Sequence, residues 1–335
     1  MSRFFLPEGY CQKLSLYKTQ EAVSFIKSDF GKRFSTALNL LKVSAPLFVD
    51  PASGLNDDLN GIQRPVSFEI AETQSGVQIV QSLAKWKRQV LHDYRFETLT
   101  GLYTDMIAVR RDEELTNIHS VYVDQWDWEK IITPRIRNIN YLKKTAQAII
   151  KAVCETSEKV NKMFPQITLD LTDKVAFVTT QELEDLYPSL SPRQRENVYL
   201  KEHKTAFIMQ IGGTLRSGIP HDTRAPDYDD WELNGDIFFY NELLDSAFEL
   251  CSMGIRVDAA ALDRQLNKAG CRDRRTLPFH SALLNNALPP AIGGGIGQSR
   301  LCMLLLQKAH IGEVQPSVWD AATVTKCRDA GIALL

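Results

Sequence analysis

The sequence lacks an excess of charge of either sign, and this absence argues against a nucleic-acid-binding role. Its 39 lysine and arginine residues nearly balance 41 aspartate and glutamate residues, for a formal net charge of -2 at pH 7. Proteins whose main ligand is nucleic acid neutralise phosphates with clustered basic side chains, and no such cluster is evident in the sequence. We therefore expect no nucleic-acid partner and no attraction to an anionic membrane.

Paired cysteines, long apolar runs and a signal-peptide core are also absent from the sequence. The cysteines, which form no CxxC pair and no metal-ligand spacing, are Cys11, Cys154, Cys251, Cys271, Cys302 and Cys327. No apolar run approaches the length of a membrane span. These absences predict reduced thiols, no membrane partner and a cytoplasmic location. Because Ser2 follows Met1, processing exposes no N-terminal cysteine nucleophile.

The hydrophobic pattern is that of a globular protein, with 44% hydrophobic and 24% charged residues. Apolar residues near the helical period predict a long helix over 19–42, and Pro46 marks an edge strand over 43–49. Further helices are predicted over 85–94, 137–163 and 181–187, and further strands over 66–70, 77–80, 101–109, 119–128, 206–211, 236–240 and 248–257. Because the strands come in neighbouring pairs, we expect an α+β fold with a mostly antiparallel sheet flanked by helices, in one catalytic domain over 1–335.

A glycine-rich stretch is the most informative motif. Gly293, Gly295, Gly297 and Arg300 fit the pattern GxGxGxxR, and apolar residues follow at helical spacing. Glycines allow a strand to lie close to a flat ligand or to a packed helix. An arginine at the start of a helix can bind a phosphate, helped by the positive helix terminus. Tight packing of strand on helix, without a ligand, is the alternative.

A second motif places charged residues between two predicted strands. Residues 110–113 read Arg-Arg-Asp-Glu, and the next strand contains Gln125. Two strands joined by a charged loop can present Arg110 and Gln125 at the same end of a pocket, where an arginine can bind a phosphate or carboxylate through two hydrogen bonds. An exposed, salt-bridged hairpin is the alternative, although the tryptophans of the second strand disfavour it.

A third motif is rich in carboxylates. Residues 221–231 suit a site for Mg²⁺ and an ammonium group, although a solvated acidic loop also explains them. Asp236 and Glu249 lie at or within apolar strands, where a carboxylate requires a cation or a hydrogen-bond partner. Two carboxylates on adjacent strands are suited to a Mg²⁺–nucleotide site.

These motifs together carry a family resemblance. Pro46 after a long helix, Arg110 with its acidic neighbours and GxGxGxxR resemble the three signatures of class II aminoacyl-tRNA synthetases. The longer blocks 82–88, 119–128, 224–231, 252–258 and 293–306 resemble the ammonia-dependent aspartate–ammonia ligases (asparagine synthetase A). The resemblance implies the class II catalytic fold, a homodimer built on residues 19–49, and ATP- and Mg²⁺-dependent synthesis of asparagine from aspartate and ammonia. The reaction would pass through a β-aspartyl-adenylate and release AMP and pyrophosphate.

The resemblance also implies roles for individual residues. Aspartate would be bound by Ser82, Lys87, Gln125 and Asp127. The catalytic group would be Asp57, Arg110 and Gln125, with Asp57 holding the substrate ammonium group or deprotonating ammonium. ATP would be bound by Arg110, Asp229, Glu249, Ser252 and Arg300, and Mg²⁺ by Asp236 and Glu249. The connection from Trp231 to Leu233 is shorter than in that family.

Two other classes of function stay open on the sequence. A class II aminoacyl-tRNA synthetase paralogue would aminoacylate a tRNA or a protein, but no basic or extra domain for a tRNA is evident. A non-catalytic regulatory paralogue would keep the fold and lose the site residues, yet both signature arginines and the acidic pair are present.

Overall fold

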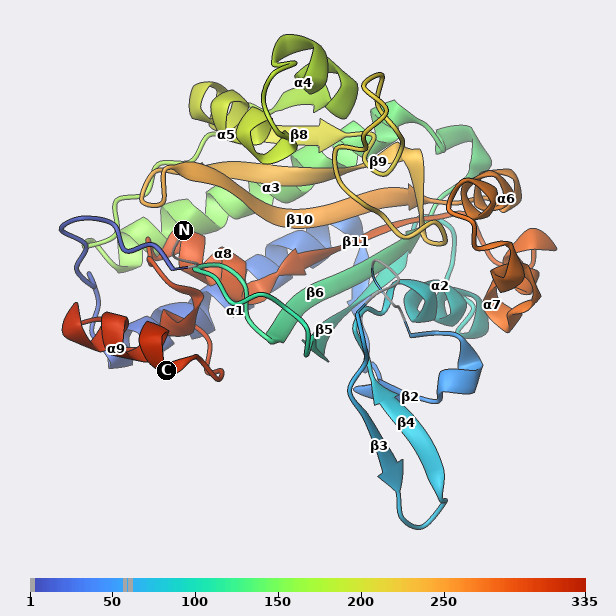
Figure 1. Cartoon of the computed structure of the whole chain (residues 1–335), viewed down its shortest axis with the longest axis horizontal. Helices are drawn as coiled ribbons and strands as arrows, with labels where there is room; N and C mark the ends of the chain where they lie inside the picture. Colours follow the sequence, from blue (N-terminus) through green and yellow to red (C-terminus); the bar gives the residue numbers. More distant parts are fainter. Residues whose placement is uncertain (1–3, 57–58, 60–62) are drawn as a thin grey trace.

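An eight-stranded sheet organises the computed structural model, which describes residues 4–56, 59 and 63–335 (Figure 1). Its strands, in spatial order, are β1 (Leu40–Lys42), β5 (Gly101–Val109), β6 (Tyr122–Ile131), β11 (Ala291–Gly297), β10 (Ser246–Arg256), β9 (Asp229–Asn241), β8 (Thr205–Met209) and β7 (Ala176–Thr179). Only the outer pairs β1–β5 and β7–β8 are parallel in the described chain; the neighbours between them are antiparallel. The predicted α+β class and mostly antiparallel sheet are confirmed.

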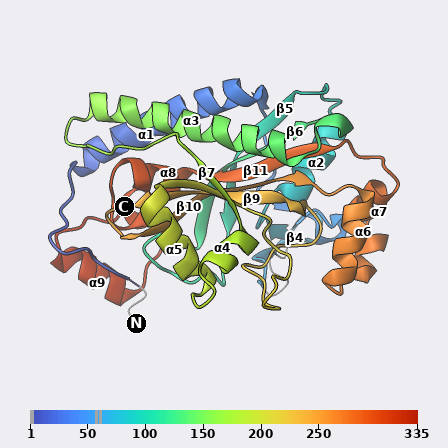
Figure 2. The same cartoon turned by 90° about the horizontal axis from the view of Figure 1, so that it is seen from above.

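Helices flank this sheet on both faces (Figure 2). They are α1 (Leu16–Leu38), α2 (Ala84–Asp93), α3 (Ile139–Met163), α4 (Thr180–Leu186), α5 (Pro192–His203), α6 (Ala259–Lys268), α7 (Pro278–Leu284), α8 (Gln298–Leu305) and α9 (Ala321–Asp329). The long helices α1 and α3 run side by side over one face of the sheet (Figure 2).

The main hydrophobic core lies between the sheet and the helices α1, α3 and α8. In α1 the ring of Phe30 lies 4.7 Å from that of Trp126, and Phe34 lies 6.1 Å from Trp128. Both tryptophans belong to β6 and are almost completely buried. Because side chains alternate along a strand, this packing turns Gln125 and Asp127 to the opposite face of the sheet. The core therefore fixes which face of β6 carries the polar site.

The segment that follows α1 differs from the prediction. The helix ends at Leu38 rather than at residue 42, because Asn39 adopts a left-handed conformation and donates its backbone N–H to Ser35 and Thr36. Residues 40–42 then pair with β5. The strand predicted over 43–49 is also wrong in extent, since only Phe48–Val49 forms a strand, β2, and Pro46 lies in the connection before it.

A three-stranded arm projects from the molecule (Figure 1). It consists of β2, β3 (Ser67–Ile70) and β4 (Ser75–Ile79), all antiparallel. Phe48 and Phe68 form an edge-to-face pair with centroids 5.3 Å apart, and each is about two-fifths exposed. The arm therefore carries aromatic surface away from the main core.

Several elements had no sequence prediction, among them β7, α5, α6, α7 and α9. The Asp258 side chain caps α6 by accepting from the N–H of Ala261, a start signal that the sequence does display. The short 231–233 connection is not a loop, because β9 runs through it without interruption.

The two terminal segments of the described chain are joined by a buried carboxylate. Glu313 is fully buried and accepts from the Tyr10 hydroxyl at 2.8 Å and from Gln12 Nε2 at 2.8 Å. It also accepts from the backbone N–H of Ala309 and His310. None of the described helices is long and apolar enough to cross a membrane.

Candidate active site

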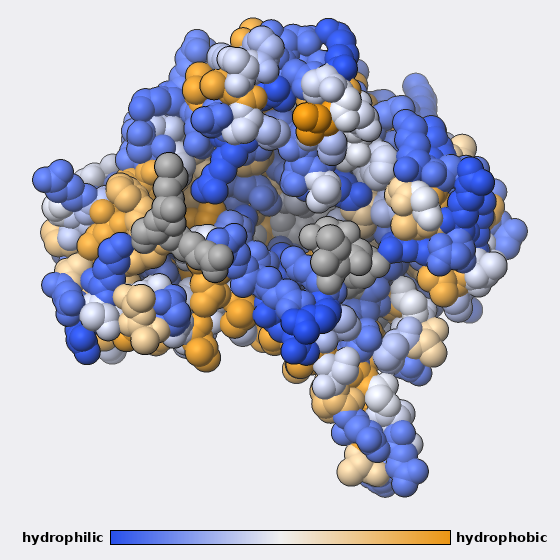
Figure 3. All heavy atoms as spheres, in the orientation of Figure 1, coloured by the Kyte–Doolittle hydropathy of each residue, from blue (hydrophilic) through white to orange (hydrophobic). Residues whose placement is uncertain are grey.

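A pocket of about 470 Å³ opens over the middle of the sheet, and Figure 3 shows this face hollowed and largely hydrophilic. It is lined by the predicted residues Ser82, Lys87, Arg110, Gln125, Asp127, Asp229, Glu249, Ser252 and Arg300. Asp236 is buried next to the pocket, where it contacts the lining residue Arg224. Asp57 lies outside the described residues. The fold thus gathers residues from six separate stretches of the sequence into one cavity.

A buried ion pair occupies one end of the pocket. Lys87 of α2 is 1% exposed, and its Nζ donates to Asp127 Oδ1 and, at 3.1 Å, to the carbonyl oxygen of Gly294. Burial lowers the pKa of Lys87, against the opposing effect of the Asp127 charge. Asp127 Oδ2 has no hydrogen-bond partner among the described residues. Two of the three ammonium donors are therefore used inside the protein, and one carboxylate oxygen stays available to a ligand.

The start of α2 is held by Ser82, whose Oγ accepts from the N–H of Ala84 at 3.1 Å. This contact sets the position of the helix turn that leads to Lys87. Ser82 therefore has a local structural role in addition to lining the pocket.

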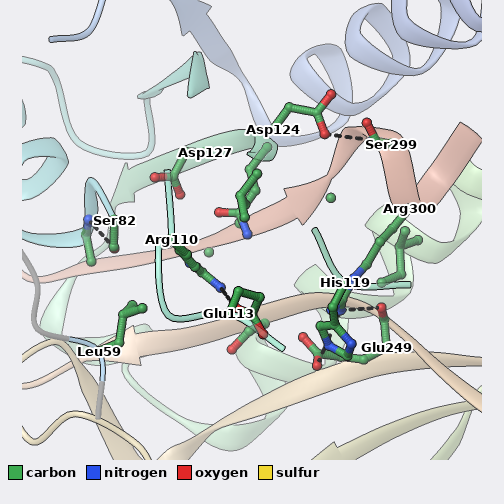
Figure 4. A pocket seen from close by; sticks show the side chains of 18 of the residues that line it. Leu59, Ser82, Arg110, Glu113, His119, Asp124, Asp127, Glu249, Ser299 and Arg300 are labelled. Carbon is green, nitrogen blue, oxygen red and sulfur yellow. Dashed lines mark hydrogen bonds and ion pairs between the residues drawn. The ribbon is translucent and has the colours of Figure 1, made fainter. Parts of the chain in front are cut away.

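Arg110 reaches into the pocket from the end of β5 (Figure 4). Its Nη1 lies 3.9 Å from Glu113 Oε2, and its buried Nε has no hydrogen-bond partner in the described structure. Burial raises the pKa of Glu113, which the nearby Arg110 charge opposes. A guanidinium with a loose ion pair and an unused donor is well placed to bind an anion.

Arg300, Glu249 and His119 form the opposite end of the pocket (Figure 4). Arg300 Nη1 donates to the Glu249 carbonyl oxygen at 3.0 Å and lies 3.6 Å from Glu249 Oε2. His119 Nδ1 lies 2.8 Å from Thr116 Oγ1. Burial, helped by the charge of Arg300, lowers the pKa of His119 to about 3, so the imidazole is neutral at pH 7.

Helix α8, which carries Arg300 in its first turn, is fixed by a carboxylate from β6. Asp124 Oδ1 accepts from the N–H of Ser299 at 3.0 Å (Figure 4), and Asp124 Oδ2 accepts from Lys27 Nζ at 2.9 Å. A carboxylate at a helix N-terminus satisfies an exposed N–H and interacts favourably with the helix dipole. Asp124 thereby orients the helix turn that presents Arg300.

A buried ionic cluster lies beneath the glycine strand. Arg256 Nε donates to Glu129 at 2.9 Å and its Nη1 donates to Asp229 at 2.5 Å, and all three side chains are at most 3% exposed. A Cβ added to Gly293 would overlap Glu129 and would lie 2.5 Å from Arg256 Nη2. Asp229 is therefore engaged by Arg256, which restricts the direct contact with ATP that the sequence predicts.

The glycines of β11 make room for the protein's own side chains. A Cβ on Gly295 would collide with Gln125 Oε1, just as one on Gly293 would collide with Glu129. The sequence favours a flat ligand or a packed helix as the reason for these glycines. Gly293 and Gly295 instead accommodate side chains of β6, which pairs with β11, whereas a Cβ on Gly297 would lie 3.0 Å from the Cβ of Arg300 in α8, as the packed-helix alternative expects.

Asp236 is strongly perturbed by its electrostatic surroundings. Its Oδ2 accepts from Arg224 Nη2, and its buried Oδ1 has no partner among the described residues. Burial, assisted by the charge of Glu249, raises the pKa of Asp236 to about 7 against the opposing effect of Arg224. The described residues contain no group of three or more potential metal ligands of the His, Cys, Asp or Glu type. Two carboxylates, one with an unused oxygen, and the hydroxyl of Ser252 nonetheless suit a Mg²⁺ ion that shares its other ligands with phosphates and water.

The structure adds lining residues to which the sequence gave no role. They are Glu113, His119, Arg224 and Arg256, together with the Asp124–Ser299 pair. His119 and Arg224 lie inside blocks 119–128 and 224–231, which carry the family resemblance, so the sequence does offer a signal for them. Arg256, the last residue of β10, lies inside block 252–258, but nothing in the sequence identifies Glu129 and Asp229 as its partners.

Comparison with known proteins gives matches over almost the whole chain. A family model described as aspartate-ammonia ligase matches residues 17–331. The chain is 54% identical over 336 residues to an aspartate–ammonia ligase of Clostridium perfringens, covering 100% of both chains. It is 53% identical over 334 residues to that of Clostridium tetani, covering 99% of this chain and 98% of the relative. An aspartate–ammonia ligase of Levilactobacillus brevis is 53% identical over 331 residues, with 98% and 99% coverage.

Solved structures with a similar fold are class II aminoacyl-tRNA synthetases. Asparaginyl-tRNA synthetase of Entamoeba histolytica, in complex with asparaginyl-adenylate, aligns with a TM-score of 0.66 and 14% identity over 91% of this chain and 68% of that one. The Pyrococcus horikoshii enzyme, also with asparaginyl-adenylate, aligns with a TM-score of 0.66 and 14% identity over 89% and 68%. These likenesses establish the class II synthetase fold.

Proposed function

The chain belongs to the aspartate–ammonia ligase family, whose members join ammonia to aspartate to form asparagine, and on that premise we propose that the central pocket binds aspartate and ATP side by side. The observation that supports this best is that one pocket contains both an ion pair suited to an amino acid and arginines suited to phosphates. The Lys87–Asp127 pair lies at one end, and Arg110 and Arg300 supply cationic groups along the rest. An amino acid carries an ammonium group and a carboxylate, so its site needs both a negative and a positive side chain. A triphosphate is an anion, so its site needs positive side chains.

Aspartate binds at the Lys87–Asp127 end in this proposal. The unpartnered Asp127 Oδ2 accepts from the substrate ammonium group, and the remaining Lys87 donor binds the α-carboxylate. Gln125, on the same face of β6, orients the substrate side chain. These contacts leave the β-carboxylate to face the phosphates, which is the geometry that the first step requires.

The first step joins two anions. A β-carboxylate oxygen attacks the α-phosphorus, the bond to pyrophosphate breaks, and a mixed anhydride of aspartate and AMP forms. Arg110 neutralises the charge that develops on the α-phosphate, and Arg300 binds the terminal phosphate or lies on the adenine. The neutral His119 beside Arg300 donates a hydrogen bond to a phosphate oxygen.

Mg²⁺ completes the phosphate site in this proposal. Asp236 and Glu249 would hold it, with Ser252 as a further oxygen donor, and the ion would neutralise phosphate charge when bound. Asp229 contributes by holding Arg256, and through it the wall of the pocket.

In the second step ammonia attacks the activated carbonyl carbon and AMP leaves. Free ammonia is the nucleophile, so ammonium must lose a proton first. We assign this task, or the binding of the substrate ammonium group, to Asp57, which lies outside the described residues.

We also propose a homodimer in the cytoplasm. The apolar face of α1 is covered by α3 and β6 within one chain, so it supplies no reason for a partner. The interface proposed over 19–49 rests instead on the edge strand β1, whose Leu41 is 63% exposed, and on the neighbouring arm. The cytoplasmic location agrees with six unpaired cysteines.

Product analysis tests the assignment. With α-labelled ATP, Mg²⁺, aspartate and ammonium, we expect AMP, pyrophosphate and asparagine in equal amounts, and little turnover with glutamine instead of ammonium. Formation of ADP and phosphate would refute the adenylate. Aspartyl-tRNA formed in a parallel reaction with tRNA would favour a synthetase, and no turnover with any of these substrates would favour a regulatory paralogue.

A further inference from the structure

Arg224 makes a contact that the proposed reaction does not use. The residue lies in the irregular segment between β8 and β9, yet its side chain reaches the pocket and is only 12% exposed. Its Nη2 donates to Asp236 Oδ2, while Nη1 donates to Asp222 Oδ2 at 2.8 Å and to the Thr223 carbonyl oxygen at 3.0 Å. The guanidinium therefore joins a local loop to a carboxylate of the sheet.

Asp236 has a requirement for positive charge that Arg224 meets only in part. The side chain is 5% exposed, and an isolated buried carboxylate is costly. Asp236 Oδ1 has no hydrogen-bond partner at normal distance among the described residues, although the Ser252 hydroxyl is near enough to lower the pKa of this carboxyl, and Glu249 adds a second negative charge nearby. Arg224 pairs with Asp236, and Arg300 lies 3.6 Å from Glu249, so each carboxylate already has a guanidinium beside it. A divalent cation that binds both carboxylates must therefore displace one of these guanidiniums.

We propose that Arg224 is a resident counter-ion of Asp236, which a divalent cation replaces when it binds. This inference rests on the proposed function, since it concerns the proposed Mg²⁺ carboxylates. The guanidinium and the metal compete for the same carboxylate, so Arg224 lowers the affinity of the nucleotide-free protein for the ion. Arg224 thereby prevents Asp236 from being buried without a cation before substrate arrives.

The surroundings of Arg224 allow such an exchange with the loss of few contacts. Two of its three hydrogen bonds go to Asp222 and Thr223, which belong to its own segment. Among the described residues, the hydrogen bond to Asp236 is the one that crosses from this segment to the sheet. Because Arg224 lines the pocket, the released guanidinium stays beside the space that the phosphates fill.

Metal binding to the nucleotide-free full-length chain tests the competition. Mn²⁺ is titrated into wild type and Arg224→Gln, with binding followed by the electron paramagnetic resonance signal of the free ion. We expect Arg224→Gln to bind Mn²⁺ at least tenfold more tightly and Asp236→Asn to remove that gain. The matched control is Arg195→Gln, because Arg195 also pairs with a carboxylate, Glu184, both are 8% exposed, and neither lines the pocket. Unchanged or weaker binding by Arg224→Gln overturns the inference.

A second measurement needs no variant, in case Arg224→Gln does not fold. Wild-type protein is labelled with phenylglyoxal, which modifies arginine, and the labelled positions are quantified by mass spectrometry. Mn²⁺ should raise the labelling rate of Arg224 several-fold and leave that of Arg195 unchanged. An unchanged or lower rate at Arg224 contradicts the exchange.

The two proposals fail in different ways. If aspartate-dependent AMP release occurs but neither Mn²⁺ affinity nor labelling responds at Arg224, the counter-ion inference is wrong and the function stands. If both respond but no AMP forms, the proposed function is wrong and the competition stands.

Discussion

At the scale of single residues, Arg110 is the side chain whose loss should be most informative. Its guanidinium has only a loose 3.9 Å ion pair and an unused buried Nε, so its removal breaks little inside the protein. We predict that Arg110→Ala lowers the rate of adenylate formation by a factor that corresponds to about 3 kcal/mol, the typical effect of removing a charge-stabilising donor. Arg110→Lys should restore little, because an ammonium lacks the planar fork of a guanidinium.

The measurement is aspartate-dependent exchange of labelled pyrophosphate into ATP. A circular dichroism spectrum and a thermal transition like those of wild type serve as the control for folding. Near-normal exchange in both variants would remove Arg110 from the phosphate site.

The sequence predicts which residues meet at the pocket better than it predicts their partners. Arg110 and Gln125 were expected at one end of a pocket, and both line it. Lys87 and Asp127 were both expected to bind aspartate, but their mutual ion pair spans 40 positions in sequence, and no local pattern reveals it. Asp229 was expected to bind ATP; it lines the pocket and is also held by Arg256, a contact that no local pattern reveals.

At the scale of elements, the packing of β11 on β6 depends on glycine at position 293. We predict that Gly293→Ala lowers the free energy of unfolding by about 1–3 kcal/mol or more, because the new methyl group would meet the buried Glu129 and lie 2.6 Å from the Trp128 carbonyl oxygen. Urea denaturation measures the change. Gly76→Ala is the control, since Gly76 is also in a strand and an added Cβ there meets nothing within 4 Å.

Equal stability of the Gly293→Ala protein and the control would show that β6 and β11 can separate without cost. A loss of stability in Gly293→Ala alone would support the close approach of the two strands as the reason for that glycine.

Long periodic elements could be predicted from sequence, and their ends could not. The pattern of 101–109 matches β5 residue for residue, because alternation and length agree there. Helix α1 was extended four residues too far, because Leu41 continues the apolar periodicity while Asn39 has already ended the helix. Tertiary pairing with β5 decided the conformation of 40–42, and local sequence does not encode such pairing.

At the scale of the whole molecule, the edge strand β1 is the feature on which we base the proposed dimer. We predict a dimer for wild type and a shift towards monomer for Leu41→Glu, because a charge in the middle of an edge strand opposes pairing and burial. Sedimentation velocity at micromolar concentration measures the change. Val318→Glu is the control, as Val318 is an equally apolar side chain, 77% exposed, in the C-terminal region.

A wild-type protein that sediments as a monomer and is fully active would refute the dimer. A dimer that persists in Leu41→Glu would place the interface elsewhere.

Acid stability is a second property of the whole molecule. His310 is 1% exposed, its Nδ1 accepts from the N–H of Gly312 at 3.0 Å, and burial lowers its pKa to about 4. A histidine in the unfolded chain has a pKa of about 6.5. Between about pH 6.5 and about pH 4 the unfolded chain therefore binds this proton more readily than the folded protein does. The contribution of neutral His310 is therefore present above pH 6.5 and lost as the pH falls, by about 3 kcal/mol in total.

Urea unfolding from pH 7 to pH 4 tests this. The stability of His310→Asn should depend less steeply on pH than that of wild type, and replacement of the exposed His92 by Asn serves as the matched control. Parallel curves for wild type and His310→Asn would assign the acid sensitivity to other groups.

The contact of Tyr10 and Gln12 with Glu313 has a consequence for synthesis on the ribosome. Residues near the start of the chain bind a carboxylate more than 300 positions later, with separations of 303 and 301. At about 5–20 residues per second, translation needs roughly 15–60 s to reach that carboxylate. Throughout that interval the leading segment has no native docking site at Glu313. Nascent chains arrested before residue 313 should therefore expose this segment to proteases that the finished protein resists.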